Sequence, residues 1–166
     1  MTYCHFYYFK IIIIKIIGGD FLQMKNINIF VYGSLREGFF NYDKYLAGKV
    51  VEKKDAILEN MRLYHMPYKG YPAITPGNDK VLGEIMVINE EEYDETVKDM
   101  DEMEGFISEN NPENEYHKIV LEVKNLQTNE KEKCFVYFYN KDKDKVFDSE
   151  SVYIPNGDWK EYMLTK

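Results

Sequence analysis

Short blocks of apolar residues, several with apolar and polar positions in alternation, run along most of this chain and predict β-strands. The blocks are separated by Gly, Pro, Asn and Asp residues, which are typical of turns. The predicted strands cover residues 27–32, 50–58, 61–66, 81–88, 116–124 and 133–139. The last two are expected to form a hairpin around residues 125–132, and Pro67 together with residues 70–74 to form a loop.

A helical period replaces this pattern in residues 90–104. Asn89 is suited to cap the start of the helix, with Glu92 reaching back to it in a capping box. Gly105 supplies the left-handed residue that commonly ends a helix. The sequence therefore predicts an amphipathic helix with defined ends.

One face of this predicted helix ends in a glutamate. The residues that share the face are Tyr93, Val97, Met100 and Glu104. Their spacing places them within roughly 60° of one another, while Glu102 points to the opposite side. Burial disfavours the ionised form of a carboxyl group, and so does the negative end of the helix dipole. The pKa of Glu104 is therefore expected to rise toward neutrality, as a general acid/base requires, unless the side chain swings out into water.

The order of the elements favours an α+β fold with a closed or strongly curled sheet, because strands dominate and hairpins connect them. Short helices are predicted at 41–46 and after a turn at 154–159. Residues 106–115 are polar and predict a surface loop that could cover a site. Residues 24–166 are expected to form a single domain with a substantial core.

The first 23 residues differ from the rest of the chain. Their apolar part, 6–17, contains two lysines and is too short to cross a bilayer as a helix. It also lacks the features of a secretory signal. Codons for residues 18–20 can contain a ribosome-binding sequence, so translation is expected to begin at Met24 and the segment before it to be a start-site artefact. A membrane-tethering segment or an additional strand is the alternative.

The chain is acidic, with a net charge of -8 at pH 7. This charge argues against binding of nucleic acid, for which a basic surface supplies most of the affinity. It argues equally against binding to an anionic membrane surface. Cys4 and Cys134 lie far apart and give little support for a disulfide framework, so a reduced, cytoplasmic location is expected.

No residue spacing in the chain is typical of a metal site or of a common cofactor loop. His5, His65 and His117 are scattered, and the patterns HExxH and CxxC are absent. The patterns GxSxG, Walker A and GxGxxG are absent as well. Serine hydrolases, nucleotide hydrolases and dinucleotide enzymes are therefore disfavoured, and neither a metal nor a cofactor is expected.

The segment YGSLREG, residues 32–38, follows directly on the first predicted strand. Backbone N–H groups in a tight Gly-Ser turn have no partners in a sheet. Several such groups together form a concavity that suits a carboxylate or a phosphate. A turn with a purely structural role is the alternative.

Several motifs occur in this chain in an order shared with a known family. They are VYGSLREG at 31–38 with Asn41, GYPAI at 70–74, VLGEI at 81–85, MDEMEG at 100–105, Tyr116 at the start of a strand, and IPNGDW at 154–159. In this order they resemble the gamma-glutamylcyclotransferase-like family over residues 27–160. The resemblance implies a small mixed β-barrel with flanking helices.

The resemblance also implies an activity, the cleavage of a γ-glutamyl-amine to 5-oxoproline and a free amine without metal or cofactor. The α-amine of such a substrate attacks its own γ-carbonyl, and one carboxylate of raised pKa can transfer the proton in both steps. Glu104 resembles the family's catalytic glutamate by its place in MDEMEG. The residues implied in binding the small-molecule substrate are Tyr32, Gly33, Ser34, Leu35 and Tyr116.

Three positions depart from the family's pattern and leave the identity of the amine open. Ser34 stands where threonine is usual, Tyr42 where histidine is common, and Lys118 where arginine is usual. Arg36 is expected to be a structural ion-pair partner, and Glu84 a second carboxylate near the site. The alternative function is a non-catalytic module that binds a small carboxylate-bearing ligand, but the retained glutamate in MDEMEG favours an enzyme.

We predict that a chain beginning at Met24 is as stable as the full chain, because residues 1–23 add no needed core. Thermal unfolding of the two chains should give nearly equal midpoints. A midpoint lower by more than several degrees after truncation would show that the segment is structural.

Overall fold

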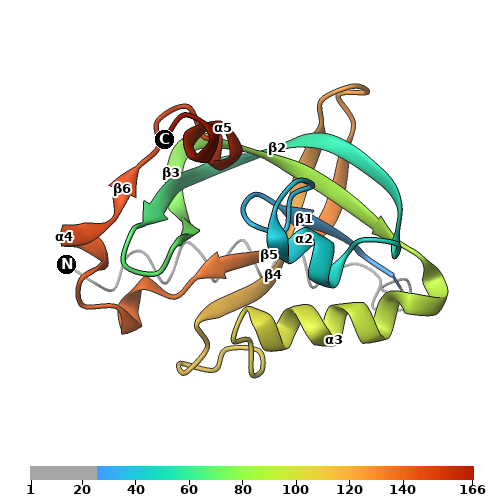
Figure 1. Ribbon diagram of the computed structural model, residues 1–166, viewed down its shortest axis with the longest axis horizontal. Helices are drawn as coiled ribbons and strands as arrows, with labels where there is room; N and C mark the ends of the chain where they lie inside the picture. Colours follow the sequence, from blue (N-terminus) through green and yellow to red (C-terminus); the bar gives the residue numbers. More distant parts are fainter. Residues whose placement is uncertain (1–25) are drawn as a thin grey trace.

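A computed structural model describes residues 26–166, so the predictions for residues 1–23 fall outside the described part of the chain. The main feature is a closed β-barrel (Figure 1). Its strands are β1 (Asn28–Val31), β2 (Val50–Met66), β3 (Tyr71–Ile88), β4 (Tyr116–Asn125) and β5 (Lys131–Tyr139). A short strand, β6 (Val152–Tyr153), extends the sheet beside β2.

The strand order around the barrel is β3-β1-β5-β4-β2, and pairing of β2 with β3 closes it. Strands β1 and β5 run parallel, and the other neighbours in the barrel run antiparallel. The barrel is therefore mixed. The predicted α+β fold, a small closed mixed barrel with flanking helices, is confirmed.

The β2–β3 hairpin is longer than the sequence pattern indicates. Residues 50–58 and 61–66, predicted as separate strands, form one strand with an irregular register at Asn60, whose φ is 62°. Residues 71–74, predicted as part of a loop, begin β3, and the buried Ile74 pairs with Leu63 there. The proline within this segment favoured a loop, because proline cannot donate a hydrogen bond within a sheet.

Helices flank the barrel. They are α2 (Phe40–Tyr45), η2 (Glu90–Glu92), α3 (Tyr93–Met103), η3 (Lys141–Lys143), α4 (Phe147–Glu150) and α5 (Trp159–Leu164). Helices α3 and α5 lie on opposite sides of the barrel (Figure 1). The predicted helices are present, although their first and last residues differ from the predicted ones. Helix α4 was not predicted from the sequence. Within residues 26–166, no helix is both long and apolar enough to cross a membrane.

The start of α3 differs from the predicted capping box. Asn89 Oδ1 accepts a hydrogen bond from the N–H of Glu91 at 3.1 Å, which begins η2 ahead of α3. The N–H of Asn89 donates to Lys49 O at 2.8 Å and is therefore already used, so Glu92 does not cap it. The end of the helix is as predicted, because Gly105 adopts a φ of 63°.

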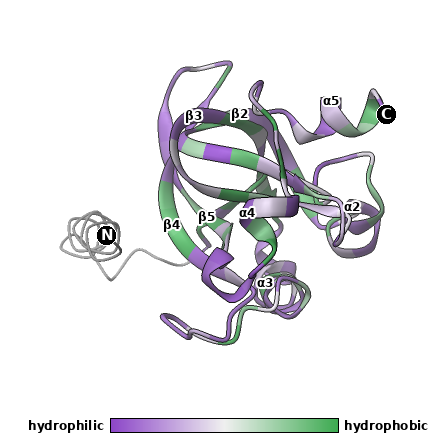
Figure 2. Ribbon diagram, turned by 90° about the vertical axis from the view of Figure 1, so that its left-hand side faces the viewer, coloured by the Kyte–Doolittle hydropathy of each residue, from purple (hydrophilic) through white to green (hydrophobic). Residues whose placement is uncertain are grey.

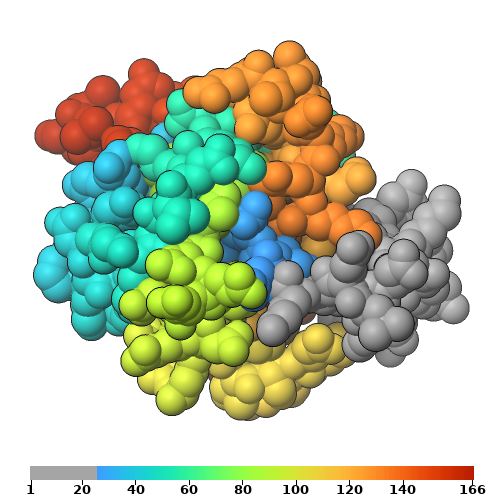
Figure 3. Space-filling model, turned by 90° about the vertical axis from the view of Figure 1, so that its right-hand side faces the viewer, coloured from blue at the N-terminus to red at the C-terminus, as the bar shows by residue number. Residues whose placement is uncertain are grey.

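Alternate residues of β1 belong to two different buried clusters. Phe30 packs with its register neighbours Ile85 and Val136 in a cluster to which all the barrel strands contribute. Figure 2 shows the curved ribbon of the barrel, with hydrophobic residues (green) along its strands. Ile29 belongs to a second cluster, together with Met100 of α3. In Figure 3, β1 (blue) is visible between the η2–α3 region (yellow-green) and the β4–β5 hairpin (orange). Packing on both faces thus fixes the end of β1, where the YGSLREG turn begins.

Candidate active site

The chain leaves β1 at Val31 and makes a tight turn before α2. The N–H of Arg36 donates to Gly33 O at 2.9 Å, which closes this turn. Within residues 26–166, the N–H groups of Gly33, Ser34 and Leu35 have no hydrogen-bond acceptor. Unpaired N–H groups of this kind are what an anion-binding concavity requires, and the anion-binding role of the turn stays a prediction.

Glycine is required at position 33 because there is no room for a side chain there, and not because the backbone adopts an unusual conformation. A Cβ atom at Gly33 would lie 2.3 Å from Cγ of Pro72 in β3. The carbonyl oxygen of Pro72 accepts a hydrogen bond from Tyr116 Oη at 2.6 Å. The glycine thus lets the turn approach β3 closely and brings it near Tyr116.

A network of ion pairs fixes the turn. Arg36 Nε lies 3.2 Å from Glu84 Oε1, and Arg36 Nη1 lies 2.7 Å from Asp158 Oδ1. Glu84 also accepts the N–H of Glu37 at 3.1 Å, and Asp158 caps the start of α5. Arg36 therefore has the structural environment expected for it. Glu84, in β3, lies near the site as expected, but it faces Arg36 and does not line the cavity described next.

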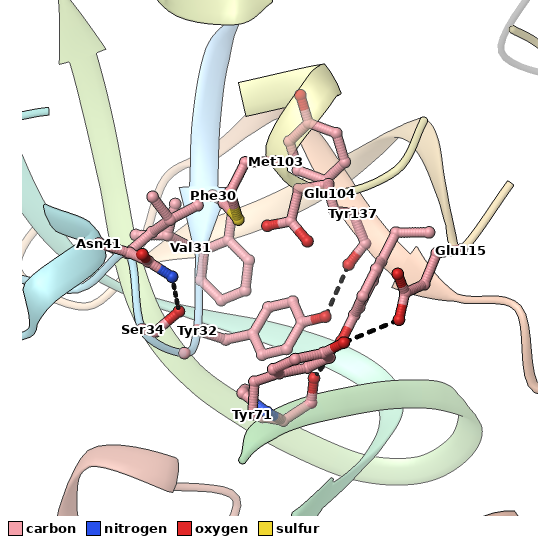
Figure 4. Close-up of a pocket in the computed structure, with 14 residues that line it drawn as sticks. Phe30, Val31, Tyr32, Ser34, Asn41, Tyr71, Met103, Glu104, Glu115 and Tyr137 are labelled. Carbon is pink, nitrogen blue, oxygen red and sulfur yellow. Dashed lines mark hydrogen bonds between the residues drawn. The ribbon is translucent and has the colours of Figure 1, made fainter. Parts of the chain in front are cut away.

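The turn forms one wall of a cavity of about 130 Å³ (Figure 4). The residues predicted for the site all line it: Tyr32, Gly33, Ser34, Leu35, Glu104 and Tyr116. They come from the end of β1, the end of α3 and the start of β4. The other lining residues were not predicted for the site, and Tyr71, Glu115 and Tyr137 among them carry ionisable side chains.

Glu104 follows the last turn of α3, and its carboxylate points into the cavity toward the ring of Tyr32 (Figure 4). The residue is partly buried, and within residues 26–166 its carboxylate has no cation or hydrogen-bond donor. Burial raises the pKa of Glu104 to about 8, and the negative charges of Glu115 and Asp101 add to the rise. The sequence predicts that burial raises the pKa of Glu104. It does not predict the contribution of the two neighbouring carboxylates.

The hydroxyl groups of two cavity tyrosines donate to backbone carbonyls. Tyr32 Oη donates to Tyr137 O at 2.7 Å, and Tyr116 Oη donates to Pro72 O. Burial raises the pKa of Tyr32 and of Tyr116 well above the usual value, so both stay neutral near pH 7. They provide aromatic walls that hydrogen bonds hold in place.

Side-chain hydrogen bonds also position the remaining polar groups of the cavity. Asn41 Nδ2 donates to Ser34 Oγ at 2.8 Å. Glu115 Oε1 accepts from Tyr71 Oη at 2.8 Å (Figure 4) and from Lys69 Nζ at 2.7 Å. Glu115 ends an acidic loop, and no sequence signal separates it from the other glutamates there. Its place in the cavity was therefore missed.

The cavity combines three chemical features. It offers unpaired N–H groups for an anion, a carboxyl group that titrates near neutral pH, and aromatic walls. Among the described residues, no group of three or more His, Cys, Asp or Glu side chains could hold a metal ion. The arrangement is suited to bind an anionic group next to a carboxyl group of raised pKa.

A family model described as Gamma-glutamyl cyclotransferase, AIG2-like, matches residues 29–161. The chain therefore belongs to this family, and the resemblance predicted from its motifs is confirmed. Membership indicates an enzyme of the gamma-glutamyl cyclotransferase type.

Individual relatives agree with this assignment. The Gamma-L-glutamyl-butirosin B gamma-glutamyl cyclotransferase of Niallia circulans is 28% identical over 137 residues, which are 82% of this chain and 78% of that protein. A crystal structure of an uncharacterised protein from Pyrococcus horikoshii matches with a TM-score of 0.54 at 24% identity, covering 84% of this chain and 94% of the other. An AIG2-like protein from Mus musculus matches with a TM-score of 0.51 at 23% identity, covering 68% of this chain and 76% of the other. The two structural matches support the fold.

We predict that Arg36→Met lowers the free energy of unfolding by about 3–5 kcal/mol, because it leaves the buried carboxylate of Glu84 without its cation. Arg62→Met is the matched control, since Arg62 pairs with Asp79 at the surface. The control should lose less than about 1 kcal/mol. Urea denaturation measures both variants, and equal losses would contradict the role of Arg36 in fixing the turn.

Proposed function

We propose that this protein cleaves a γ-glutamyl-amine to 5-oxoproline and a free amine, with Glu104 as the general acid and base. Family membership supports a gamma-glutamyl cyclotransferase reaction. The role of Glu104 rests on one observation: its carboxyl group, with a pKa raised to about 8, lines the same cavity as the turn at residues 33–35.

The turn is suited to bind the glutamyl group of the substrate. The free N–H groups of Gly33, Ser34 and Leu35 can donate to its α-carboxylate. The Ser34 hydroxyl, positioned by Asn41, adds a polar contact at the same wall. Binding here would place the α-amine toward Glu104 and bend the chain so that this amine approaches the γ-carbonyl. Because the reaction is intramolecular, such orientation supplies much of the rate enhancement.

The reaction forms one bond and breaks one bond. The neutral α-amine attacks the γ-carbonyl carbon, and a proton of this amine passes to the carboxylate of Glu104. Glu104 then donates the proton to the leaving nitrogen as the bond between that nitrogen and the γ-carbon breaks. The ring closes to 5-oxoproline, the amine departs, and Glu104 returns to its starting state. A pKa of about 8 suits a group that accepts and returns a proton near neutral pH.

The surroundings of Glu104 favour an enzyme over a module that only binds a carboxylate-bearing ligand. An ionised Glu104 would repel an anionic ligand at the turn. A carboxyl group kept away from water also costs stability unless it is paired, and Glu104 has no cation within residues 26–166. Proton transfer explains why a carboxyl group occupies this position.

We predict that Glu104→Gln reduces turnover of a γ-glutamyl-amine by roughly 10²–10⁴-fold, because the variant keeps the size of the side chain but loses the titratable group. Affinity for the substrate should change little. Mass spectrometry of released 5-oxoproline measures turnover. The rise of wild-type kcat/KM with pH up to about 8 should be absent from the residual activity of the variant.

Stability supplies a second readout for the same variant. The folded wild type keeps a proton on Glu104 that the unfolded chain loses above its ordinary pKa of 4.5. The free energy of unfolding of the wild type should therefore fall as pH rises from 4.5 to about 8, relative to that of Glu104→Gln.

Glu102→Gln is the matched control, because Glu102 lies on the same helix but is exposed and faces Lys98 at 3.8 Å. It should leave turnover nearly unchanged. Full activity of Glu104→Gln on a confirmed substrate would refute the catalytic assignment. Glu115, which lines the same cavity, would then be the next candidate.

A further inference from the structure

Two carboxylates from different parts of the fold lie near Glu104. Asp101 precedes it by three residues on α3, a spacing that makes side chains neighbours on the surface of a helix. Glu115 lies just before β4 and lines the same cavity as Glu104. Backbone hydrogen bonds hold the two segments together, because the N–H of Glu115 donates to Gly105 O at 3.0 Å and that of Tyr116 donates to Glu104 O at 3.2 Å. Both negative charges are therefore fixed beside Glu104.

A pair of residues from neighbouring strands holds Asp101. Lys118 Nζ donates to Asp101 Oδ2 at 2.6 Å, and Tyr137 Oη donates to Asp101 Oδ1 at 2.6 Å. Lys118 of β4 lies directly opposite Tyr137 of β5 in the sheet. Both oxygens of the carboxylate are thus engaged, and Asp101 links the last turn of α3 to two strands of the barrel.

Glu115 has partners of the same two kinds. Its Oε1 atom accepts from Lys69 Nζ at 2.7 Å and from Tyr71 Oη at 2.8 Å. Each of the two carboxylates is therefore bonded to one lysine and one tyrosine. The two tyrosines, Tyr71 and Tyr137, line the cavity, whereas within residues 26–166 no lysine or arginine lines it. The charge nearest to the cavity in each ion pair is thus on the side of the carboxylate.

The other ionisable groups around Glu104 carry no charge near pH 7. Tyr32, Tyr71, Tyr116 and Tyr137 come from β1, β3, β4 and β5 and line the cavity. Burial raises the pKa of each of them above the usual value for tyrosine. Within residues 26–166, the charges that act on Glu104 are those of Asp101 and Glu115, and these raise its pKa.

The lysines offset part of this effect. A nearby negative charge disfavours the ionised form of a carboxyl group, and a nearby positive charge favours it. A carboxylate bonded to a lysine therefore acts more weakly on its surroundings than a carboxylate alone. The balance matters for proton transfer, because a group that titrates far above the working pH stays protonated, and one that titrates far below it is a weak base.

We propose that the ion pairs Asp101–Lys118 and Glu115–Lys69 are positioning residues that set the pH range in which Glu104 exchanges its proton. This inference rests on the proposed function of Glu104 and adds four residues that act through it. Within each pair the carboxylate moves that range to higher pH, and the lysine moves it to lower pH.

One variant of each residue tests the proposal in the full chain. Asp101→Asn and Glu115→Gln keep the shape of the side chain and remove the negative charge. Lys118→Met and Lys69→Met keep an extended side chain and remove the positive charge. Carboxyl-carbon NMR of the labelled protein gives the titration midpoint of Glu104 in each variant. The pH dependence of kcat/KM for release of 5-oxoproline from γ-glutamyl-L-alanine gives a second readout.

The two members of a pair should have opposite effects. Asp101→Asn and Glu115→Gln should lower the midpoint of Glu104, and Lys118→Met and Lys69→Met should raise it. The expected size is at least roughly half a pH unit, which is the effect of one charge about 6 Å away even at the dielectric constant of water. The rise of kcat/KM with pH should move in the same direction, since titration of the substrate itself is the same for every variant.

Opposite shifts distinguish electrostatic tuning from a purely structural role. Both variants of a pair remove the same salt bridge, so a role in stability alone predicts the same effect for both. Asp99→Asn and Lys49→Met are the matched controls. Asp99 is on the same helix as Asp101 and pairs with Lys49 at 3.8 Å, but neither residue lines the cavity. The controls should leave the midpoint of Glu104 unchanged.

The outcomes separate this inference from the proposed function. Unchanged midpoints, or shifts of the same sign for both members of each pair, would overturn the tuning role. Opposite shifts by NMR, together with a kcat/KM profile that stays fixed, would show that Glu104 is not the group whose proton limits the reaction. The proposed function of Glu104 would then fail, while the electrostatic effect of the pairs on this residue would stand.

Discussion

The candidate active site depends on the ion pairs that Arg36 makes behind the YGSLREG turn. A turn with free N–H groups has no sheet partner at those groups, so other contacts must hold it in place. Arg36 joins the turn to Glu84 in β3 and to Asp158 at the start of α5. These three segments are far apart in the sequence. The wall of the cavity that carries the N–H donors is therefore set by tertiary contacts rather than by the turn itself.

Two glutamates near this turn show how surroundings decide what a carboxyl group does. Glu84 faces Arg36 and the N–H of Glu37, so it serves as the acceptor of a salt bridge and a hydrogen bond. Glu104 faces no cation within residues 26–166, and burial, with the nearby charge of Glu115, raises its pKa to about 8. The same side chain thus stabilises structure at one position and is suited to proton transfer at the other.

The sequence predicts the local features of this fold well and the non-local ones poorly. Alternation and helical period are local, so the first strand follows from them, and so does the helix face that Glu104 shares with Met100. The pattern alone does not decide whether the Glu104 side chain points inward or swings out into water. The full length of the β2–β3 hairpin depends on pairs such as Leu63 with Ile74, which no local pattern reveals. Glu115 enters the cavity for a similar reason: its loop lies next to Tyr71 only because the barrel closes.

The pKa of Glu104 in the folded protein tests the proposed proton-transfer role of this residue most directly. Carboxyl-carbon NMR of the labelled full chain, with Glu104→Gln to assign the signal, gives the titration midpoint of this one group. A midpoint near 8 is expected. A midpoint near the ordinary value of 4.5 would show that the carboxyl group is solvated, and it would contradict the proton-transfer role.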